Sequence, residues 1–172
     1  MKIIYLLILL LGIFSVISAF VALYRNPMSI RNRILVGLSF VTGPLWGGSI
    51  ILFLQTNDII IERVAANLIY TAAILASLLT FFLTKFFSHK VSFKWYERIF
   101  LYIPSVFFFF EIWFTDDFIL SITNKTPQFS YLYIVWLLWF FLVMGSRIAI
   151  LGRDLRKLSV TDIERKQITY LI

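Results

Sequence analysis

The residues of this chain that could carry chemistry are few. The 172-residue sequence has no cysteine, which excludes disulfides, thiolate metal sites and cysteine nucleophiles. Its nine acidic residues are scattered, whereas a zinc or haem site needs several clustered ligands. The single histidine, His89, would need a nearby carboxylate to act as a general base, and the nearest acid in the sequence is Glu97. We therefore expect no catalytic residues, no metal site, no cofactor and no enzymatic activity.

Glu111 is an acidic residue inside an apolar run, Phe107–Phe114. In the middle of a bilayer an acidic side chain costs at least about 2.5–3.5 kcal/mol, but this cost falls toward the interface. Because Glu111 lies close to Asp116 in sequence, the simpler interpretation is a solvated carboxylate at the outer boundary of a membrane. The functional interpretation is an outward-facing pocket for a small cationic or amphipathic ligand. Glu111, Trp113, Asp116 and Asp117 would then face that ligand.

Three small residues, Ser39, Gly43 and Gly47, recur at a spacing of four in another apolar run. Such a stripe lets two membrane helices approach closely where lipid supplies no hydrophobic driving force. Pro44 lies within the stripe and lacks a backbone donor, so it should kink the helix. A kinked helix could move during signalling, which makes Gly43, Pro44 and Gly47 candidate switch residues. A packing seam alone would explain the same pattern.

Membrane-spanning helices must position these residues, because the composition excludes a water-soluble domain. The chain is 60% apolar and only 15% charged, and its mean hydropathy is +0.90. Soluble domains have about a quarter charged residues. The apolar residues come in long blocks, and a block of about 20 residues can cross a hydrocarbon layer of roughly 30 Å. The sequence therefore predicts an all-α membrane protein.

We predict five spans within a single domain that covers residues 1–172. The spans cover residues 3–23, 34–54, 64–83, 95–114 and 131–151, and an amphipathic tail follows at 152–172. The fourth span includes Trp95 and Tyr96, which are rings typical of a headgroup boundary. The first block could instead be a signal peptide cleaved near Ala19, but its apolar run exceeds the usual h-region of roughly 7–15 residues.

The positive charges predict how the chain is oriented. Of its 16 lysines and arginines, all except Lys2, Arg63 and Lys125 lie in or beside the segments 24–33, 84–98 and 152–172. Lys and Arg in short loops are retained on the cytoplasmic side. We therefore expect the N-terminus outside, the C-terminus in the cytoplasm, and a multi-pass protein of the inner (plasma) membrane. The net charge of +7 indicates contact with the lipid bilayer and no nucleic acid.

The tail predicts one further helix. Thr161 and Glu164 have the spacing of a capping box, which starts a helix near Asp162. That helix would run to Ile172 as the beginning of a sixth span. We therefore expect this chain to be the N-terminal piece of a larger protein.

Three segments resemble a known family. The loop Arg25–Arg33 is similar to an N-P-x-S-x-x-N-R run, Trp46-Gly47 follows in the second span, and Arg165–Leu171 is similar to an R-R/K-Q-L/I-x-Y-L pattern. In this order, over the whole chain, they resemble the N-terminal seven-helix sensor region of bacterial membrane histidine kinases, which also precedes diguanylate cyclases. The sequence departs from that family in lacking helices six and seven and an output domain. The family has no general ligand set, so the resemblance transfers no binding residues.

The resemblance implies a signal-input module of a two-component or cyclase system. Such a module passes an extracytoplasmic or membrane signal to a cytoplasmic kinase or cyclase domain in the same polypeptide, and a homodimer is a further expectation. Transmitter activity would belong to that output domain. The alternative is a small membrane carrier or transporter subunit, which would use the Gly43-Pro44 break as its discontinuous helix.

Overall fold

The computed structural model describes residues 2–25, 29–87 and 94–157. The predictions for His89, for the loop residues 26–28 and for the tail 158–172, including its capping box, lie outside these residues. About 85% of the structure is helical, which confirms the all-α class.

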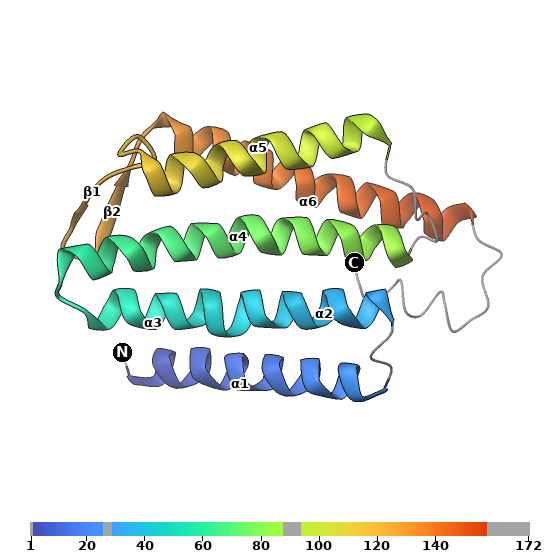
Figure 1. Cartoon of the computed structure of the whole chain (residues 1–172), viewed down its shortest axis with the longest axis horizontal. Coiled ribbons are helices and arrows are strands. Elements are labelled where there is room, and N and C mark those ends of the chain that lie inside the picture. Colours follow the sequence, from blue (N-terminus) through green and yellow to red (C-terminus); the bar gives the residue numbers. More distant parts are fainter. Residues whose placement is uncertain (1, 26–28, 88–93, 158–172) are drawn as a thin grey trace.

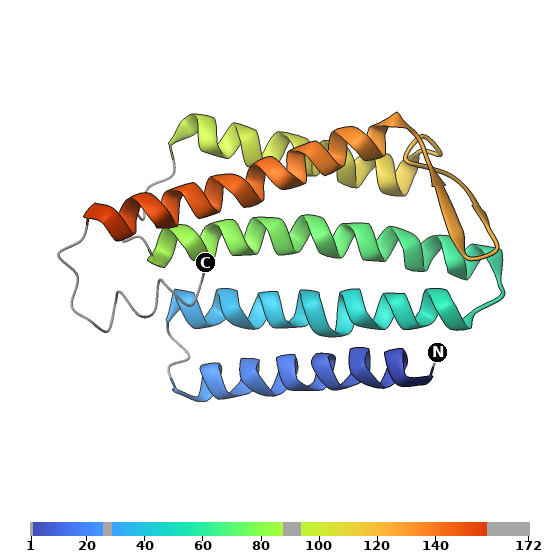
Figure 2. The same ribbon diagram turned by 180° about the vertical axis from the view of Figure 1, so that it is seen from behind.

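The described residues form five long helical segments and one hairpin. In order, the elements are α1 (Lys2–Arg25), α2 (Ile30–Phe40), η1 (Val41–Gly47), α3 (Gly48–Gln55), α4 (Ile59–Phe87), α5 (Trp95–Phe114), β1 (Ile119–Thr123), β2 (Thr126–Phe129) and α6 (Tyr131–Lys157). Figures 1 and 2 show the helices side by side, with α1 at one edge, then α2–η1–α3, then α4, and then α5 and α6. The hairpin, the α3–α4 connection and the start of α1 all lie at one end, which we call the hairpin end.

Three of these segments are long and apolar enough to cross a membrane. They are Ile30–Gln55, Ile59–Phe86 and Tyr131–Arg153. This confirms the coarse prediction of a membrane protein with spanning helices. Two further predicted spans do not meet the same criteria. Among the described residues, α1 contributes the shorter apolar helix Leu6–Val21, and α5 contains Glu97, Arg98 and Glu111.

Carboxylates fix the starts of two helices. Asp58 Oδ1 accepts hydrogen bonds from the backbone N–H groups of Ile60 at 2.8 Å and Ile61 at 3.2 Å. Glu97 Oε2 accepts one from the backbone N–H of Lys94 at 3.0 Å. A side-chain oxygen stabilises a helix start by pairing N–H groups that have no partner within the helix. Because Asp58 supplies that cap, α4 begins before residue 64, where the predicted span began.

Where the sequence predicts a kink, at Pro44, the structure has a π-helical turn. Pro44 lies inside η1, between the regular helices α2 and α3. Proline removes one backbone donor and its ring clashes with the preceding turn, so the ordinary hydrogen-bond ladder cannot continue through it. A π turn widens the helix locally and is one of the known ways to absorb such a defect. The second segment therefore changes its winding near its middle without being interrupted.

The β-hairpin was not predicted. Strands β1 and β2 pair antiparallel, and Thr123 faces Thr126 across the turn. The turn residues Asn124 and Lys125 have φ of 50° and 61°. Two consecutive positive φ values are the mark of the type I′ turn that matches the twist of a two-stranded ribbon. The predicted connector between the fourth and fifth spans is therefore an ordered element.

The hydrophobic core lies among α4, α5, α6 and the hairpin. Its largest fully buried apolar side chains are Phe108, Phe118, Leu101, Leu151 and Val143. Helix α1 differs sharply, because Ala19 is its only buried residue among the side chains described. It packs against α2, η1 and α3 at the edge of the molecule.

Small residues form the contact between α1 and η1. A Cβ atom added to Gly43 would lie 3.1 Å from the carbonyl oxygen of Gly12 and 3.3 Å from its Cα. Ser15 Oγ donates to the Ser39 carbonyl oxygen at 3.1 Å, in the same contact. A Cβ at Gly47 would lie 3.1 Å from Ile8 Cγ2. The predicted small-residue stripe is thus the surface on which α1 lies.

Alanine at Gly43 should weaken this contact, and alanine at Gly48 is its matched control. A Cβ at Gly48 meets nothing within 4 Å. Both substitutions favour helix by about 1 kcal/mol, but Gly43→Ala also pushes against the Gly12 backbone. We expect thermal unfolding in detergent at a lower temperature for Gly43→Ala than for wild type, and at an equal or higher temperature for Gly48→Ala. Equal unfolding temperatures for the two variants would contradict the close contact.

Candidate functional site

Charged side chains mark the two ends of the α4 span. Helix α4 has no charged residue between Arg63 and Lys85. At 1.5 Å per residue this interval is about 33 Å long, which matches a hydrocarbon layer of roughly 30 Å. Glu62 and Arg63 lie at the hairpin end, and Lys85 lies at what we call the opposite end. Charged side chains from the neighbouring segments bind α4 near these same two ends.

Two adjacent residues of α4 hold the hairpin in place. Glu62 forms an ion pair with Lys125 in the hairpin turn. Arg63 forms an ion pair with Asp116 and donates through Nη2 to the carbonyl oxygen of Ile119 at 3.2 Å. The two ends of the hairpin are therefore bound to the first turns of one helix.

Tyr70 lies at the centre of an aromatic cluster beneath the hairpin. Its ring makes edge contacts with Phe118 at 5.4 Å, Phe129 at 5.5 Å, Tyr133 at 6.0 Å and Trp136 at 5.5 Å between centroids. Phe129 and Tyr133 also stack at 4.1 Å. Such pairs add about 0.5–1.5 kcal/mol each beyond the area they bury. The cluster joins α4, the hairpin and the first turns of α6 into one unit.

The predicted ligand-facing residues are mostly engaged within the fold. Glu111 Oε2 accepts a hydrogen bond from Thr115 Oγ1 at 2.8 Å. Trp113 Nε1 donates to Thr71 Oγ1 of α4 at 2.8 Å. Asp116 binds Arg63, as described above, whereas the Asp117 side chain is exposed. Trp113 and Asp116 therefore join α5 to α4, and Glu111 bonds within its own helix.

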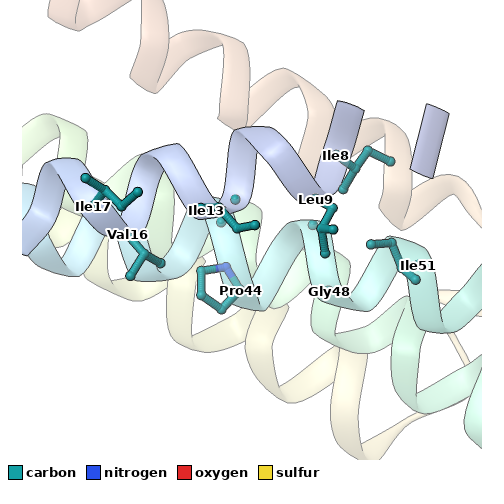
Figure 3. Close-up of a pocket in the computed structure, with 11 residues that line it drawn as sticks. Ile8, Leu9, Ile13, Val16, Ile17, Pro44, Gly48 and Ile51 are labelled. Carbon is teal, nitrogen blue, oxygen red and sulfur yellow. The ribbon is translucent and has the colours of Figure 1, made fainter. Parts of the chain in front are cut away.

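The predicted switch residues lie elsewhere. Helix α4 separates η1 from α5, so Gly43, Pro44 and Gly47 are not brought together with Glu111. They line a groove of about 330 Å³ between α1 and the η1–α3 segment (Figure 3). Its other lining residues are apolar or glycine: Ile8, Leu9, Gly12, Ile13, Val16, Ile17, Gly48 and Ile51. This groove suits hydrocarbon and offers nothing to a polar solute.

Sequence reasoning missed Glu62, Tyr70 and Lys125 as structural partners. Besides Lys2, the charge pattern leaves two bases at the hairpin end, Arg63 and Lys125. In the topology prediction they are exceptions to the rule that Lys and Arg lie on the cytoplasmic side. Each lies in a connector that has acidic residues and few other bases, and this was the signal that could have predicted ion pairs. Tyr70 gave no such signal, because an aromatic residue within an apolar run is ordinary.

A buried ion pair lies at the opposite end. Lys85 of α4 binds Glu97 of α5, and their side chains are only 5% and 15% exposed. Among the described residues, no group of His, Cys, Asp or Glu could hold a metal ion.

Loss of the Glu62 carboxylate should release the hairpin turn. The Glu62 and Lys125 side chains are 11% and 28% exposed, whereas those of Arg63 and Asp116 are 38% and 83% exposed. Breaking a largely buried pair costs about 2 kcal/mol or more, and breaking an exposed pair costs under about 1 kcal/mol. We expect Glu62→Gln to destabilise the protein more than Asp116→Asn.

Limited proteolysis reports the hairpin directly. Trypsin should cut after Lys125 faster in Glu62→Gln than in wild type, because the freed lysine and its turn become accessible. Asp117→Asn removes a charge from the same end without breaking an ion pair and is the control. Equal cleavage rates in all three proteins would contradict the role of Glu62.

Comparison with known protein families, with curated proteins and with solved structures found no match to this chain.

Proposed function

We propose that this chain is a membrane-embedded signal-input module. In it, the hairpin end receives an extracytoplasmic or membrane signal, and α6 carries the resulting displacement toward the cytoplasm. The observation that carries the proposal is the direct junction between β2 and α6. Ser130 alone separates them; its N–H donates to the Phe118 carbonyl oxygen at 3.4 Å, and its Oγ accepts from the Leu132 N–H at 3.1 Å.

A direct junction matters because a flexible loop would absorb motion. Helix α6 continues from Tyr131 to Lys157, so it reaches from the hairpin end to the opposite end in one piece. The aromatic cluster and the Glu62–Lys125 pair couple the hairpin to both α4 and α6. A ligand or lipid change that favours another position of the hairpin would therefore bias the position of α6 as well.

Two features support a second arrangement of the helices. Asn67 Oδ1 and Trp136 Nε1 are buried and have no hydrogen-bond partner among the described residues. Each unpaired buried polar group costs about 1–3 kcal/mol, so the present packing around the cluster is not optimal. The π turn at Pro44 is the other feature, since π turns often occur at functional sites.

The orientation and the number of spans are part of the proposal. In this proposal the opposite end lies in the cytoplasm of a cell bounded by an inner (plasma) membrane, and the excess of Lys and Arg at that end supports this orientation. Glu97 and Asp116 flank the apolar part of α5 and bind Lys85 and Arg63 of α4. On this basis α5 crosses the same layer as α4, and α1 completes five spans.

The output would be a kinase or cyclase domain in the same polypeptide, as the family resemblance implies. A carrier or transporter subunit, the alternative, would need polar groups along a discontinuous helix. The groove beside Pro44 is apolar throughout, so the structure gives that alternative little support.

Cysteine labelling tests the orientation, because the natural chain contains no cysteine. Asn124→Cys places a thiol in the exposed hairpin turn, and Lys94→Cys places one at the exposed start of α5. A membrane-impermeant maleimide applied to intact cells should label the first variant and not the second. After the cells are lysed, both should be labelled. The reverse pattern in intact cells would overturn the proposed orientation.

The signalling role predicts an effect on output. In membranes that contain this chain joined to its proposed kinase or cyclase domain, Glu62→Gln should change the output activity at least about twofold, since it frees the hairpin from α4. Gln128→Ala alters an exposed hairpin side chain and should leave the activity unchanged. Unchanged output activity in Glu62→Gln, or solute uptake by liposomes that contain the chain, would contradict this function.

A further inference from the structure

Arg147 is a positively charged residue inside the α6 span. It belongs to the apolar segment Tyr131–Arg153, and its side chain is half-buried. A buried arginine normally binds a carboxylate or another anion. The partners of Arg147 within the described residues are both neutral: Nε donates to Thr84 Oγ1 at 3.3 Å, and Nη1 lies 2.9 Å from Met144 Sδ.

None of the acidic side chains described in the structure binds Arg147. Glu97 is the only one of them at the opposite end, and it binds Lys85. The guanidinium group has five N–H donors, and a hydroxyl and a thioether use two of them. Within the described part of the chain, Arg147 therefore keeps both its full charge and donors for a ligand.

Thr84 fixes the position of the guanidinium group. The Thr84 side chain is buried, at 3% exposed. Its hydroxyl donates to the Thr80 carbonyl oxygen at 2.9 Å and accepts the hydrogen bond from Arg147. With its own proton committed to Thr80, the hydroxyl can act only as an acceptor toward Arg147. The arginine is therefore held against α4 rather than extended freely into the surroundings.

The depth of Arg147 follows from the register of α4 and α6. Tyr70 and Tyr133 face each other, and so do Thr84 and Arg147; the two residues of each pair are 63 positions apart. The two helices therefore run parallel and in step over at least this stretch. Arg147 lies level with Lys85, where the charge-free interval of α4 ends. This is the boundary of the hydrocarbon layer, where lipid phosphates are found.

We propose that the opposite end of the α4–α6 contact binds a phosphate group, with Arg147 as its principal ligand, and that this phosphate belongs to the headgroup of an anionic phospholipid. The planar fork of arginine matches two phosphate oxygens. A lipid brings its phosphate to the required depth, whereas a free phosphate ion must leave water to reach it. This site is independent of the signalling role proposed above.

Lipid binding by the purified chain tests the site. Native mass spectrometry from detergent micelles would compare dioleoyl phosphatidylglycerol with dioleoyl phosphatidylcholine. We expect wild type to retain the anionic lipid preferentially and Arg147→Gln to bind it about tenfold more weakly, which is the effect of losing one good charged contact. Thr84→Val removes the hydroxyl that positions the arginine and should cause a smaller loss.

Arg98→Gln is the matched control. Arg98 lies on α5 at the same end and is exposed, so this variant removes the same charge without touching the proposed site. It should bind the anionic lipid within about twofold of wild type, whereas a purely nonspecific attraction would weaken both variants equally. Equal losses in Arg98→Gln and Arg147→Gln, or equal retention of the two lipids by wild type, would overturn the proposal.

Two further measurements separate the geometry of the arginine from its charge, and a lipid from a free anion. If Arg147→Gln does not fold, Arg147→Lys keeps the charge but loses the fork, and it should still bind the anionic lipid several-fold more weakly than wild type. Inorganic phosphate distinguishes the source of the ligand. It should neither displace the lipid nor raise the unfolding temperature at millimolar concentration. Displacement by inorganic phosphate would assign the site to a soluble anion and overturn the lipid assignment.

Discussion

The thickness of the hydrocarbon layer is the constraint on which the rest of this structure depends. Along a spanning helix, the charged groups on either side of the layer must lie about 30 Å apart. A charged group that lies deeper in the layer must be paired with another polar group. Helix α4 meets the requirement with a charge-free interval that Arg63 and Lys85 bound. Helix α5 is bound to α4 at the same two levels, because Asp116 binds Arg63 and Glu97 binds Lys85. Charge placement thus aligns two neighbouring helices with each other.

The same charges explain why the hairpin can be ordered. An isolated two-stranded hairpin is marginally stable in water. Here Glu62 and Arg63 bind its two ends, and the rings around Tyr70 cover its inner face. Neither contribution depends on the intrinsic stability of the strands. The hairpin is therefore an extension of the α4–α6 core, and its position is coupled to the helices beneath it.

Sequence reasoning predicted the long helices and the irregularity at Pro44, because both are properties of local sequence. A long apolar block and a proline act on their own residues. It missed the hairpin, whose turn contains Asn124 and Lys125 rather than the familiar Asn-Gly pair. The ligand-facing role of Glu111, Trp113 and Asp116 stays a prediction; in the structure Trp113 and Asp116 bind α4 and Glu111 binds Thr115. Contacts between residues more than 40 positions apart carry no local signal, so sequence spacing alone could not assign the α4 partners of Trp113 and Asp116.

The two sides of α4 differ in how their contacts would respond to motion. On one side, α1 is held by glycine contacts and a serine hydrogen bond, and among its described side chains only Ala19 is buried. Lipid can replace most of such a contact at little cost, since lipid tails are as apolar as the side chains they would cover. On the other side, α5 and α6 are joined to α4 by ion pairs, ring contacts and the Trp113–Thr71 hydrogen bond. Lipid tails cannot replace the ion pairs or the hydrogen bond among these contacts. Movement at the hairpin end should therefore pass along α4 and α6 together, while α1 adjusts to it.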